Sequence, residues 1–109
     1  MKPTSSLGDF EQIVLLAILR LDDNAYGVSI RLEIAKHTGR SVAPGALYTA
    51  LDRLEEKKHV KSRMGDPTPQ RGGRAKRYYT VTASGRQAVI HSQTTFRSLL
   101  QGLELFREA

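Results

Sequence analysis

The sequence predicts a mainly α-helical domain with one small β-hairpin, followed by a long C-terminal helix. Apolar residues recur at helical spacing in three segments before residue 58. Two short segments rich in β-branched and aromatic residues then flank a loop with two prolines and a Gly-Gly pair. A last segment carries apolar residues seven apart. We therefore divide the 109 residues into 1–82 and 83–109, which are expected to form one compact unit.

The first helix is predicted to run from an N-cap at Ser6 to about Leu21. Acidic residues in its first turn, Asp9 and Glu11, suit the helix dipole. Its centre, Ile13–Leu19, is apolar on every side, and a buried strand is the alternative for these residues. A helix that is apolar all round needs cover on more than one side. So short a chain offers little cover, which indicates a partner subunit.

Two further helices, Tyr26–His37 and Pro44–Lys57, are predicted on either side of a short turn. Gly39 suits the end of the first one, and Pro44 suits the first position of the second. On a helical projection of the second, one side is an apolar stripe of Leu47, Leu51 and Leu54. Tyr48 lies on the flank, and the opposite side carries Gly45, Thr49, Asp52, Arg53 and Glu56. Two helices joined in this way form a helix-turn-helix pattern.

A basic hairpin is predicted next, with strands at Val60–Gly65 and Lys76–Thr82. Residues 57–77 hold eight Lys or Arg and one acid, Asp66. Because Tyr78 and Tyr79 alternate along a strand, one of them is expected in the core. A half-buried helix followed by a basic hairpin indicates a helix for a DNA groove beside a basic wing. The alternative is an ordinary core helix with a solvated charged hairpin.

A last helix is predicted from an N-cap at Thr82 to the C-terminus. Its apolar residues form a seam that Ser92 interrupts. Such a seam has little to pack on within so small a chain, so we expect it to hold a homodimer together. The predicted interface residues are Val89, Phe96, Leu99, Leu103 and Phe106.

The excess of positive charge is local. The net charge is +6, and residues 40–86 alone hold 11 basic residues and 4 acids. A concentrated positive charge is typical of a face that binds a polyanion. The chain has no cysteine, and its longest uncharged apolar run, Ile13–Leu19, is too short to span a membrane. With no signal-peptide pattern at its start, the protein is expected in the cytoplasm.

No catalytic or metal site can be assembled from the sequence. The three histidines, His37, His59 and His91, lack partners at metal-ligand spacing. Ser84 lacks the flanking glycines of a nucleophile elbow, and Gly72–Gly73 lacks the spacing of a phosphate-binding loop. We therefore expect neither an enzyme nor a cofactor.

Three segments together resemble the PadR-like family of bacterial transcriptional regulators: AYGVSIR (25–31), APGALYTALDRLEEKKHV (43–60) and GGRAKRYYTVTASGRQAV (72–89). The resemblance implies a winged helix-turn-helix domain, a homodimer built through the C-terminal dimerisation helix, and usually repression of a nearby promoter. It also implies that Gly27 starts the second helix, that Leu47–Tyr48 and Leu51 belong to the recognition helix, and that Arg74–Tyr79 open the second wing strand.

Two positions depart from the family pattern. Ala43 stands where a capping serine is usual, so Ser41 would have to replace the cap or about 1 kcal/mol is lost. Lys58 stands where glycine usually ends the recognition helix. A non-glycine residue in the left-handed region costs roughly 1 kcal/mol or more, so either the helix ends differently or the wing direction changes. The chain has no tryptophan, and nothing in it indicates a small-molecule effector.

The expected function is that of a sequence-specific regulator, a repressor that binds double-stranded operator DNA as a homodimer. A winged-helix module for protein–protein interaction and a non-specific architectural duplex-binding protein are the alternatives. Arg53 is the best candidate for a guanine or phosphate contact, unless it pairs with Asp52 or Glu56; Tyr48 either reaches a phosphate or packs in the core. The predicted DNA-contacting residues are Gly45, Tyr48, Thr49, Arg53, Arg71, Arg74, Lys76 and Arg77.

Overall fold

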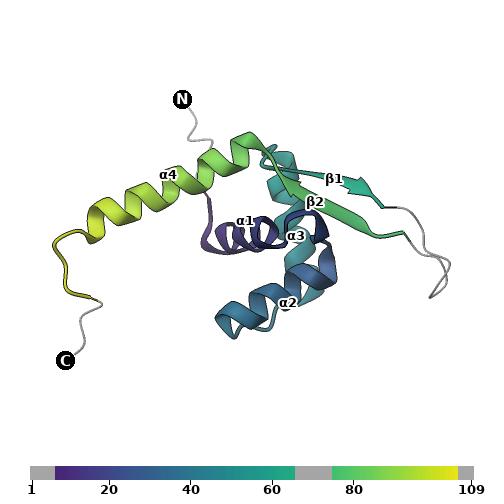
Figure 1. The fold of residues 1–109 in the computed structure, drawn as a ribbon, viewed down its shortest axis with the longest axis horizontal. Coiled ribbons are helices and arrows are strands. Elements are labelled where there is room, and N and C mark those ends of the chain that lie inside the picture. The colour runs from purple at the N-terminus through teal and green to yellow at the C-terminus, as the bar shows by residue number, and fades with distance from the viewer. Residues whose placement is uncertain (1–6, 66–74, 106–109) are drawn as a thin grey trace.

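The structure, a computed structural model, describes residues 7–65 and 75–105. Figure 1 shows the elements these residues form: α1 (Asp9–Leu21), α2 (Gly27–Thr38), α3 (Pro44–Glu56), β1 (Val60–Met64), β2 (Arg77–Val81) and α4 (Ala83–Leu100). The predicted fold class is confirmed, and Ile13–Leu19 is helix rather than strand. No helix within the described residues is long and apolar enough to cross a membrane.

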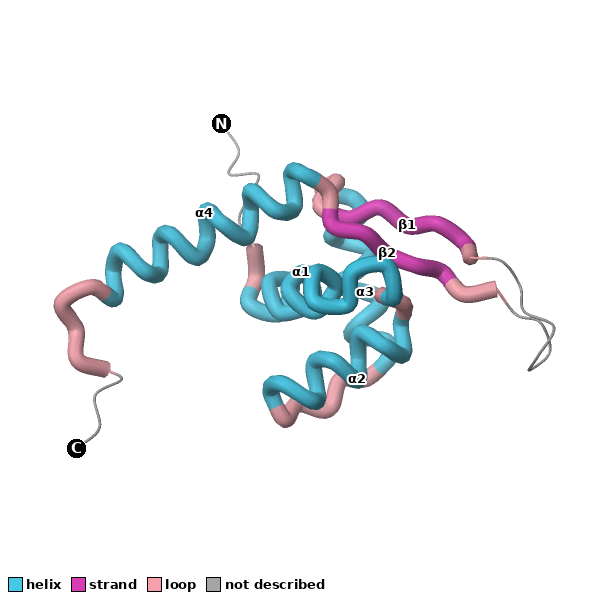
Figure 2. The backbone as a smooth tube through the Cα atoms, viewed as in Figure 1, coloured by secondary structure: helices cyan, strands magenta, loops and turns pink. Residues whose placement is uncertain are grey.

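Helix α1 is the element around which the others pack. It contacts α2, α3, α4 and β2, and in Figure 2 it lies between α4 above and α2 below. Val14, Leu15 and Ile18 are almost completely buried in this core, whereas Leu16 keeps 40% of its surface exposed. The chain therefore covers most of α1 by itself, because β2 and α4 return to it. The strip of α1 around Leu16 still lacks the cover that the sequence predicted a partner would supply.

The N-terminus of α1 differs from the sequence prediction. The N-cap is Gly8 rather than Ser6, which lies outside the described residues. The Gly8 amide donates a hydrogen bond of 3.0 Å to the Glu11 carboxylate. Because a residue in the first turn thus reaches back to the cap, the helix begins at Asp9 without a capping side chain.

Helices α2 and α3 form the predicted helix-turn-helix. Gly39 ends α2 in the left-handed conformation, with φ of 75°. The turn is held by Arg31, whose Nε donates to the Val42 carbonyl at 2.8 Å. Ala43 is the N-cap of α3 and provides no side-chain hydrogen bond. Within the described residues Ser41 forms no hydrogen bond that would restore the missing cap.

Strands β1 and β2 form the predicted antiparallel hairpin. The register pairs Val60 with Val81 and Met64 with Arg77. The hairpin is also joined to the start of α2, because Tyr26 and Tyr78 form an isolated antiparallel bridge. Residues 66–74, which contain most of the predicted loop with two prolines, lie outside the described residues.

Helix α4 begins as predicted but ends earlier. The Thr82 hydroxyl caps it by accepting a hydrogen bond from the Gly85 amide at 3.1 Å. Its first half packs on the core through Val89, and the Gln93 amide group donates to the Gln12 side chain on α1 at 3.0 Å. Its second half projects away from the body (Figure 1). The prediction that this helix continues to the C-terminus is wrong, because the chain becomes extended at Gln101.

The end of α3 has a left-handed residue that is not glycine. Lys58 has φ of 67°. The His59 amide donates to the Leu54 carbonyl at 2.8 Å, and the Lys58 amide donates to the Glu55 carbonyl at 3.0 Å. This is the Schellman arrangement that usually contains glycine at this position. The first alternative left by the sequence, a different helix end, is therefore wrong: the helix ends in the usual way and Lys58 carries the conformational cost.

Lys58→Gly is expected to raise the free energy of unfolding by about 0.5–1 kcal/mol, because glycine reaches positive φ without a Cβ clash. Urea denaturation measures this difference. The control Glu56→Gly, in the last turn of α3, should lower the same quantity by up to about 1 kcal/mol. A Lys58→Gly protein less stable than the wild type would show that the left-handed residue is not strained.

Candidate nucleic-acid interface

One side of α3 is open to solvent along the helix. Leu47, Leu51 and Leu54 are completely buried, so the opposite side faces outward and exposes Gly45 and Thr49. A Cβ on Gly45 would meet open space: in the described part of the chain, no atom beyond its chain neighbours and its own helix backbone lies within 4 Å. The outward orientation of Gly45 and Thr49 agrees with the sequence prediction, and their contact with DNA stays a prediction.

The two halves of the outward side of α3 differ in charge. The N-terminal half carries the small, neutral residues Gly45 and Thr49, whereas the C-terminal half exposes Asp52, Arg53 and Glu56, two acids and one base. Negative side chains repel DNA phosphates. A nucleic acid would therefore approach the N-terminal half of α3 more readily than the C-terminal half.

Tyr48 lies on the flank of α3 that faces α2. A Cβ added to Gly27, the first residue of α2, would overlap the Tyr48 hydroxyl and would come within 2.9 Å of the ring carbon that carries it. Tyr48 nevertheless keeps 45% of its surface exposed. The ring thus packs on α2 and reaches the surface, and both roles that the sequence left open are compatible with this position.

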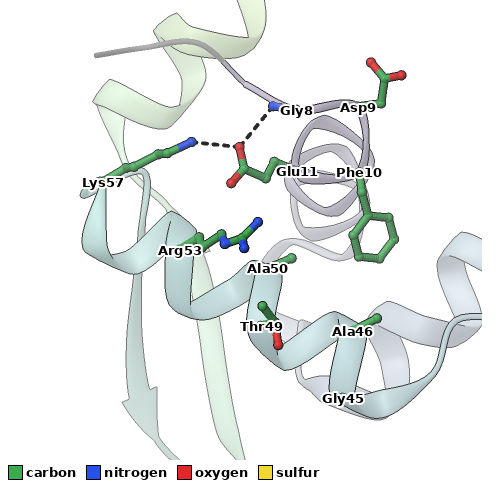
Figure 3. A pocket seen from close by; sticks show the side chains of 10 residues that line it. All are labelled: Gly8, Asp9, Phe10, Glu11, Gly45, Ala46, Thr49, Ala50, Arg53 and Lys57. Carbon is green, nitrogen blue, oxygen red and sulfur yellow. Dashed lines mark hydrogen bonds and ion pairs between the residues drawn. The ribbon is translucent and has the colours of Figure 1, made fainter. Parts of the chain in front are cut away.

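An open cleft of about 700 Å³ lies on the other flank of α3, against the N-terminus of α1 (Figure 3). Lys57 closes one end of it, donating to the Glu11 carboxylate at 2.8 Å. Burial alone would raise the pKa of Glu11, but the hydrogen bonds from Lys57 and from the Gly8 amide outweigh burial and lower it. The lowered pKa keeps the Glu11 carboxyl ionised to a more acidic pH than usual, and the ion pair joins α1 to the end of α3.

Arg53 lines the same cleft. In Figure 3 its side chain extends from α3 toward Glu11, and its charge contributes to the lowered pKa of that carboxyl. Within residues 7–65 and 75–105, Arg53 forms no ion pair with Asp52 or Glu56. The surface pair considered from the sequence is therefore not formed. The guanidinium lies at the edge of the outward side of α3, where it remains available to a ligand.

The ends of the two strands next to the connecting loop carry cations stacked on aromatic rings. The Lys76 ammonium lies 4.2 Å from the centre of the Tyr26 ring, and the Arg63 guanidinium lies 4.8 Å from the centre of the Tyr78 ring. The two rings meet edge to face, with centroids 5.6 Å apart. Such contacts stabilise a cation by roughly 0.5–1 kcal/mol at exposed sites. Each ring therefore favours one position of its cation at the surface of the hairpin.

Arg77 lies on the other face of β2. Its guanidinium donates to the Ser62 hydroxyl at 3.1 Å, and that hydroxyl donates to the Glu55 carboxylate at 2.8 Å. This chain of hydrogen bonds joins the hairpin to α3. Tyr79 is the core tyrosine predicted from the alternation, and burial raises the pKa of its hydroxyl despite the nearby charge of Arg77.

Two residues join those predicted to contact DNA, and two of the predicted residues lie outside the described part of the chain. Tyr26 lies under Lys76, and Arg63 lies over Tyr78, so both belong to the basic side of the hairpin. In the sequence, the only signal for Arg63 was the alternation along β1, and the only signal for Tyr26 was its position before α2. Arg71 and Arg74 lie outside the described residues. Gly45, Thr49 and Arg53 share α3, while Lys76 and Arg77 lie on two faces of the hairpin.

The residues predicted to form a dimer interface separate into three groups. Val89 is 7% exposed and belongs to the core of its own chain. Phe96, Leu99 and Leu103 are 51%, 71% and 57% exposed, and Leu103 lies beyond the end of α4. Phe106 lies outside the described residues. The apolar surface available to a partner is therefore on the projecting part of α4 and just after it.

Comparison with known families gives one match. The sequence model of the family described as "Transcriptional regulator PadR-like family" matches residues 15–90. No curated protein matches the sequence. The matched residues run from the middle of α1 into α4 and include all of the helix-turn-helix and both strands.

Solved structures share the fold. A PadR family transcription regulator from Clostridium difficile R20291 is 26% identical, with a TM-score of 0.67, over 83% of this chain and 90% of that one. A transcriptional regulator from Clostridium thermocellum is 22% identical, with a TM-score of 0.69, over 90% and 92% of the two chains. A PadR family transcriptional regulator from Eggerthella lenta DSM 2243 is 23% identical, with a TM-score of 0.69, over 90% and 84%.

Gly27→Ala is expected to lower the free energy of unfolding by about 1–3 kcal/mol, because the new methyl group overlaps the hydroxyl end of Tyr48. Tyr48→Ala should remove most of that cost in the double variant, and a double-mutant cycle by urea denaturation measures the coupling. Gly45→Ala, where the space is open, is the matched control and should not destabilise. Strictly additive effects at positions 27 and 48 would mean that the two residues do not touch.

Proposed function

The chain belongs to the PadR-like family of transcriptional regulators, and from this premise we propose that it is a homodimeric, sequence-specific repressor that binds operator DNA. In this proposal α3 is the recognition helix and the β1–β2 hairpin is the wing. One observation carries it: a small, neutral, outward-facing half of α3 lies beside a hairpin whose cations are held in place by aromatic rings.

The recognition helix would enter the major groove by its N-terminal half. The major groove is wide enough to admit a helix, and Gly45 leaves room for the backbone to come close to base edges. Thr49, one turn later, would meet a base through its methyl or hydroxyl group. The acidic residues Asp52 and Glu56 would stay clear of the phosphates, so the helix axis is expected to tilt away from the groove toward its C-terminus.

Basic side chains on both flanks of α3 would position the helix. Lys76 and Arg77 on the wing, with Arg63 beside them, support contact with the phosphate backbone or the minor groove. Arg71 and Arg74, between the two strands in the sequence, are proposed to add to that contact. Arg53, on the opposite flank, would contact a phosphate or a guanine. Phosphate contacts fix register and orientation, whereas base contacts supply specificity.

A second copy of the chain is proposed to pack on the projecting half of α4. Phe96 and Leu99 are exposed there, Leu103 is exposed just after α4, and Leu16 is exposed on α1. Burying large apolar side chains contributes roughly 1.5–3 kcal/mol each, and a two-fold interface buries each of them twice. The dimer would hold two recognition helices about one DNA turn, ~34 Å, apart. Repression follows if that dimer covers a promoter, as the family resemblance implies.

DNA binding is tested with a labelled duplex from the region upstream of its own gene and a random duplex of equal length. We expect the upstream duplex to bind about 10³-fold or more tightly. Gly45→Ala should weaken that binding about tenfold, because a methyl group is added to a close interface, and leave the random duplex unaffected. The same variant should be as stable as the wild type or more so. Equal affinity of the wild type for both duplexes would contradict sequence-specific binding.

The homodimer is tested with Leu99→Asp. Leu99 is exposed within one chain, so the variant should fold normally but dimerise about 100-fold or more weakly, because a charge replaces a buried apolar group at each copy. Light scattering measures the mass, and binding of the upstream duplex should weaken in parallel. Thr94→Asp, on the opposite side of α4, is the matched control. A Leu99→Asp protein that remains a dimer would place the interface elsewhere.

A further inference from the structure

Residues 57–59 connect the recognition helix to the rest of the molecule. Lys57 pairs with Glu11 on α1 at 2.8 Å. The Thr82 hydroxyl donates to the Lys58 carbonyl at 2.7 Å, and the Thr82 amide donates to the His59 carbonyl at 2.9 Å. The end of α3 is thus bonded to α1 and to the residue that caps α4. Any movement of these three residues changes the direction of α4 relative to α3.

The His59 side chain completes this connection. It is 5% exposed, and its Nδ1 lies 2.9 Å from the Ser84 hydroxyl in the first turn of α4. Gly85 packs so closely that a Cβ there would overlap the His59 carbonyl oxygen. The first turn of α4 therefore rests on both the backbone and the ring of His59.

The second ring nitrogen of His59 has an unusual environment. Nε2 is buried and has no hydrogen-bond partner within residues 7–65 and 75–105. A neutral imidazole whose Nε2 is unprotonated carries its proton on Nδ1 and can donate it to the Ser84 hydroxyl. An imidazolium carries a proton on both nitrogens, so Nε2 would become a buried charged donor with no acceptor, which is strongly unfavourable.

We propose that His59, in its neutral form, is a positioning residue for DNA binding: it fixes the start of α4 against the end of α3, and its protonation releases that contact. The inference rests on the proposed function, because α4 is the proposed dimer element and α3 the proposed reader. If the angle between them changes, two recognition helices can no longer match one operator. DNA binding is then lost on acidification while the helix-turn-helix itself remains folded.

The surrounding charges oppose protonation on balance. Burial lowers the pKa of His59 below its usual 6.5, Lys57 at the end of α3 lowers it further, and Glu11 on α1 raises it. The Glu11 carboxylate is already bonded to Lys57 and the Gly8 amide, and Ser84 on α4 carries no charge. When folding lowers the pKa of a histidine, the free energy of unfolding is at its full value above about pH 6.5. It falls as the pH drops from there toward the lowered pKa.

This direction is opposite to the general behaviour of DNA-binding proteins. Acidification adds positive charge to a protein, and added positive charge strengthens binding to phosphates. Weakening of binding at acidic pH would therefore identify a buried group whose charge disrupts the interface geometry.

The experiment measures the affinity of the full chain for the upstream duplex from about pH 8 to about pH 5. We expect affinity to fall by about tenfold per pH unit for each His59 of the dimer, once the pH is below the pKa of that residue. His59→Gln, which keeps a polar group and does not titrate, should bind at neutral pH and retain its affinity in acid. His91→Gln, at an exposed position on α4, is the matched control and should behave as the wild type does.

Ser84→Ala supplies a second measurement in case His59→Gln does not fold. It removes the hydroxyl that His59 contacts, and we expect affinity at neutral pH to fall about three- to tenfold with the dimer intact. Unchanged affinity in this variant, or equal acid loss in His59→Gln and the wild type, would overturn the positioning role. Affinity that rises on acidification would overturn it too. Failure of the wild type to bind either duplex at neutral pH would instead overturn the proposed function, and this inference with it.

Discussion

The burial of Leu47, Leu51 and Leu54 against α1 is the interaction on which the proposed DNA-facing surface depends. All three side chains are completely buried, and each contributes roughly 1.5–3 kcal/mol by leaving water. Because they share one side of α3, their burial fixes the rotation of the helix about its axis. Gly45 and Thr49 face outward as a result, and the flanks are assigned in the same way: Tyr48 turns toward α2, and Arg53 turns toward the N-terminus of α1.

The hairpin owes its position to α2 as much as to its own pairing. Two strands alone are marginally stable in water. Here β2 is also bonded to the residues just before α2. Tyr26 and Tyr78 form a bridge, and the Tyr79 amide donates a hydrogen bond of 2.9 Å to the Ala25 carbonyl. The same contacts bring Tyr26 under Lys76. A feature that stabilises the fold thus also holds a basic side chain at the surface where DNA is proposed to lie.

Conformational strain and an unpartnered polar atom occur together where α3, β1 and α4 meet. Lys58 adopts a left-handed conformation without being glycine, and the adjacent His59 leaves Nε2 without a partner in the described part of the chain. Each costs free energy that the surrounding contacts must offset, and such costs tend to persist where geometry matters for function. The first turn of α4 contacts the same two residues, because Thr82 bonds the Lys58 carbonyl and Gly85 packs against the His59 carbonyl.

The sequence by itself determined the order of the helices and strands, the side of α3 that faces outward, and the N-cap of α4, because periodicity, glycine and capping residues act over a few neighbouring positions. It also carried the family resemblance in three short segments. It did not reveal contacts between residues distant in the chain, since these leave no local pattern. Only the tertiary structure decided that Val89 is a core residue, that Arg53 lies beside Glu11, and that α4 ends at Leu100. For the same reason, only the tertiary structure brought together Gly27 with Tyr48, Tyr26 with Lys76, and His59 with Ser84.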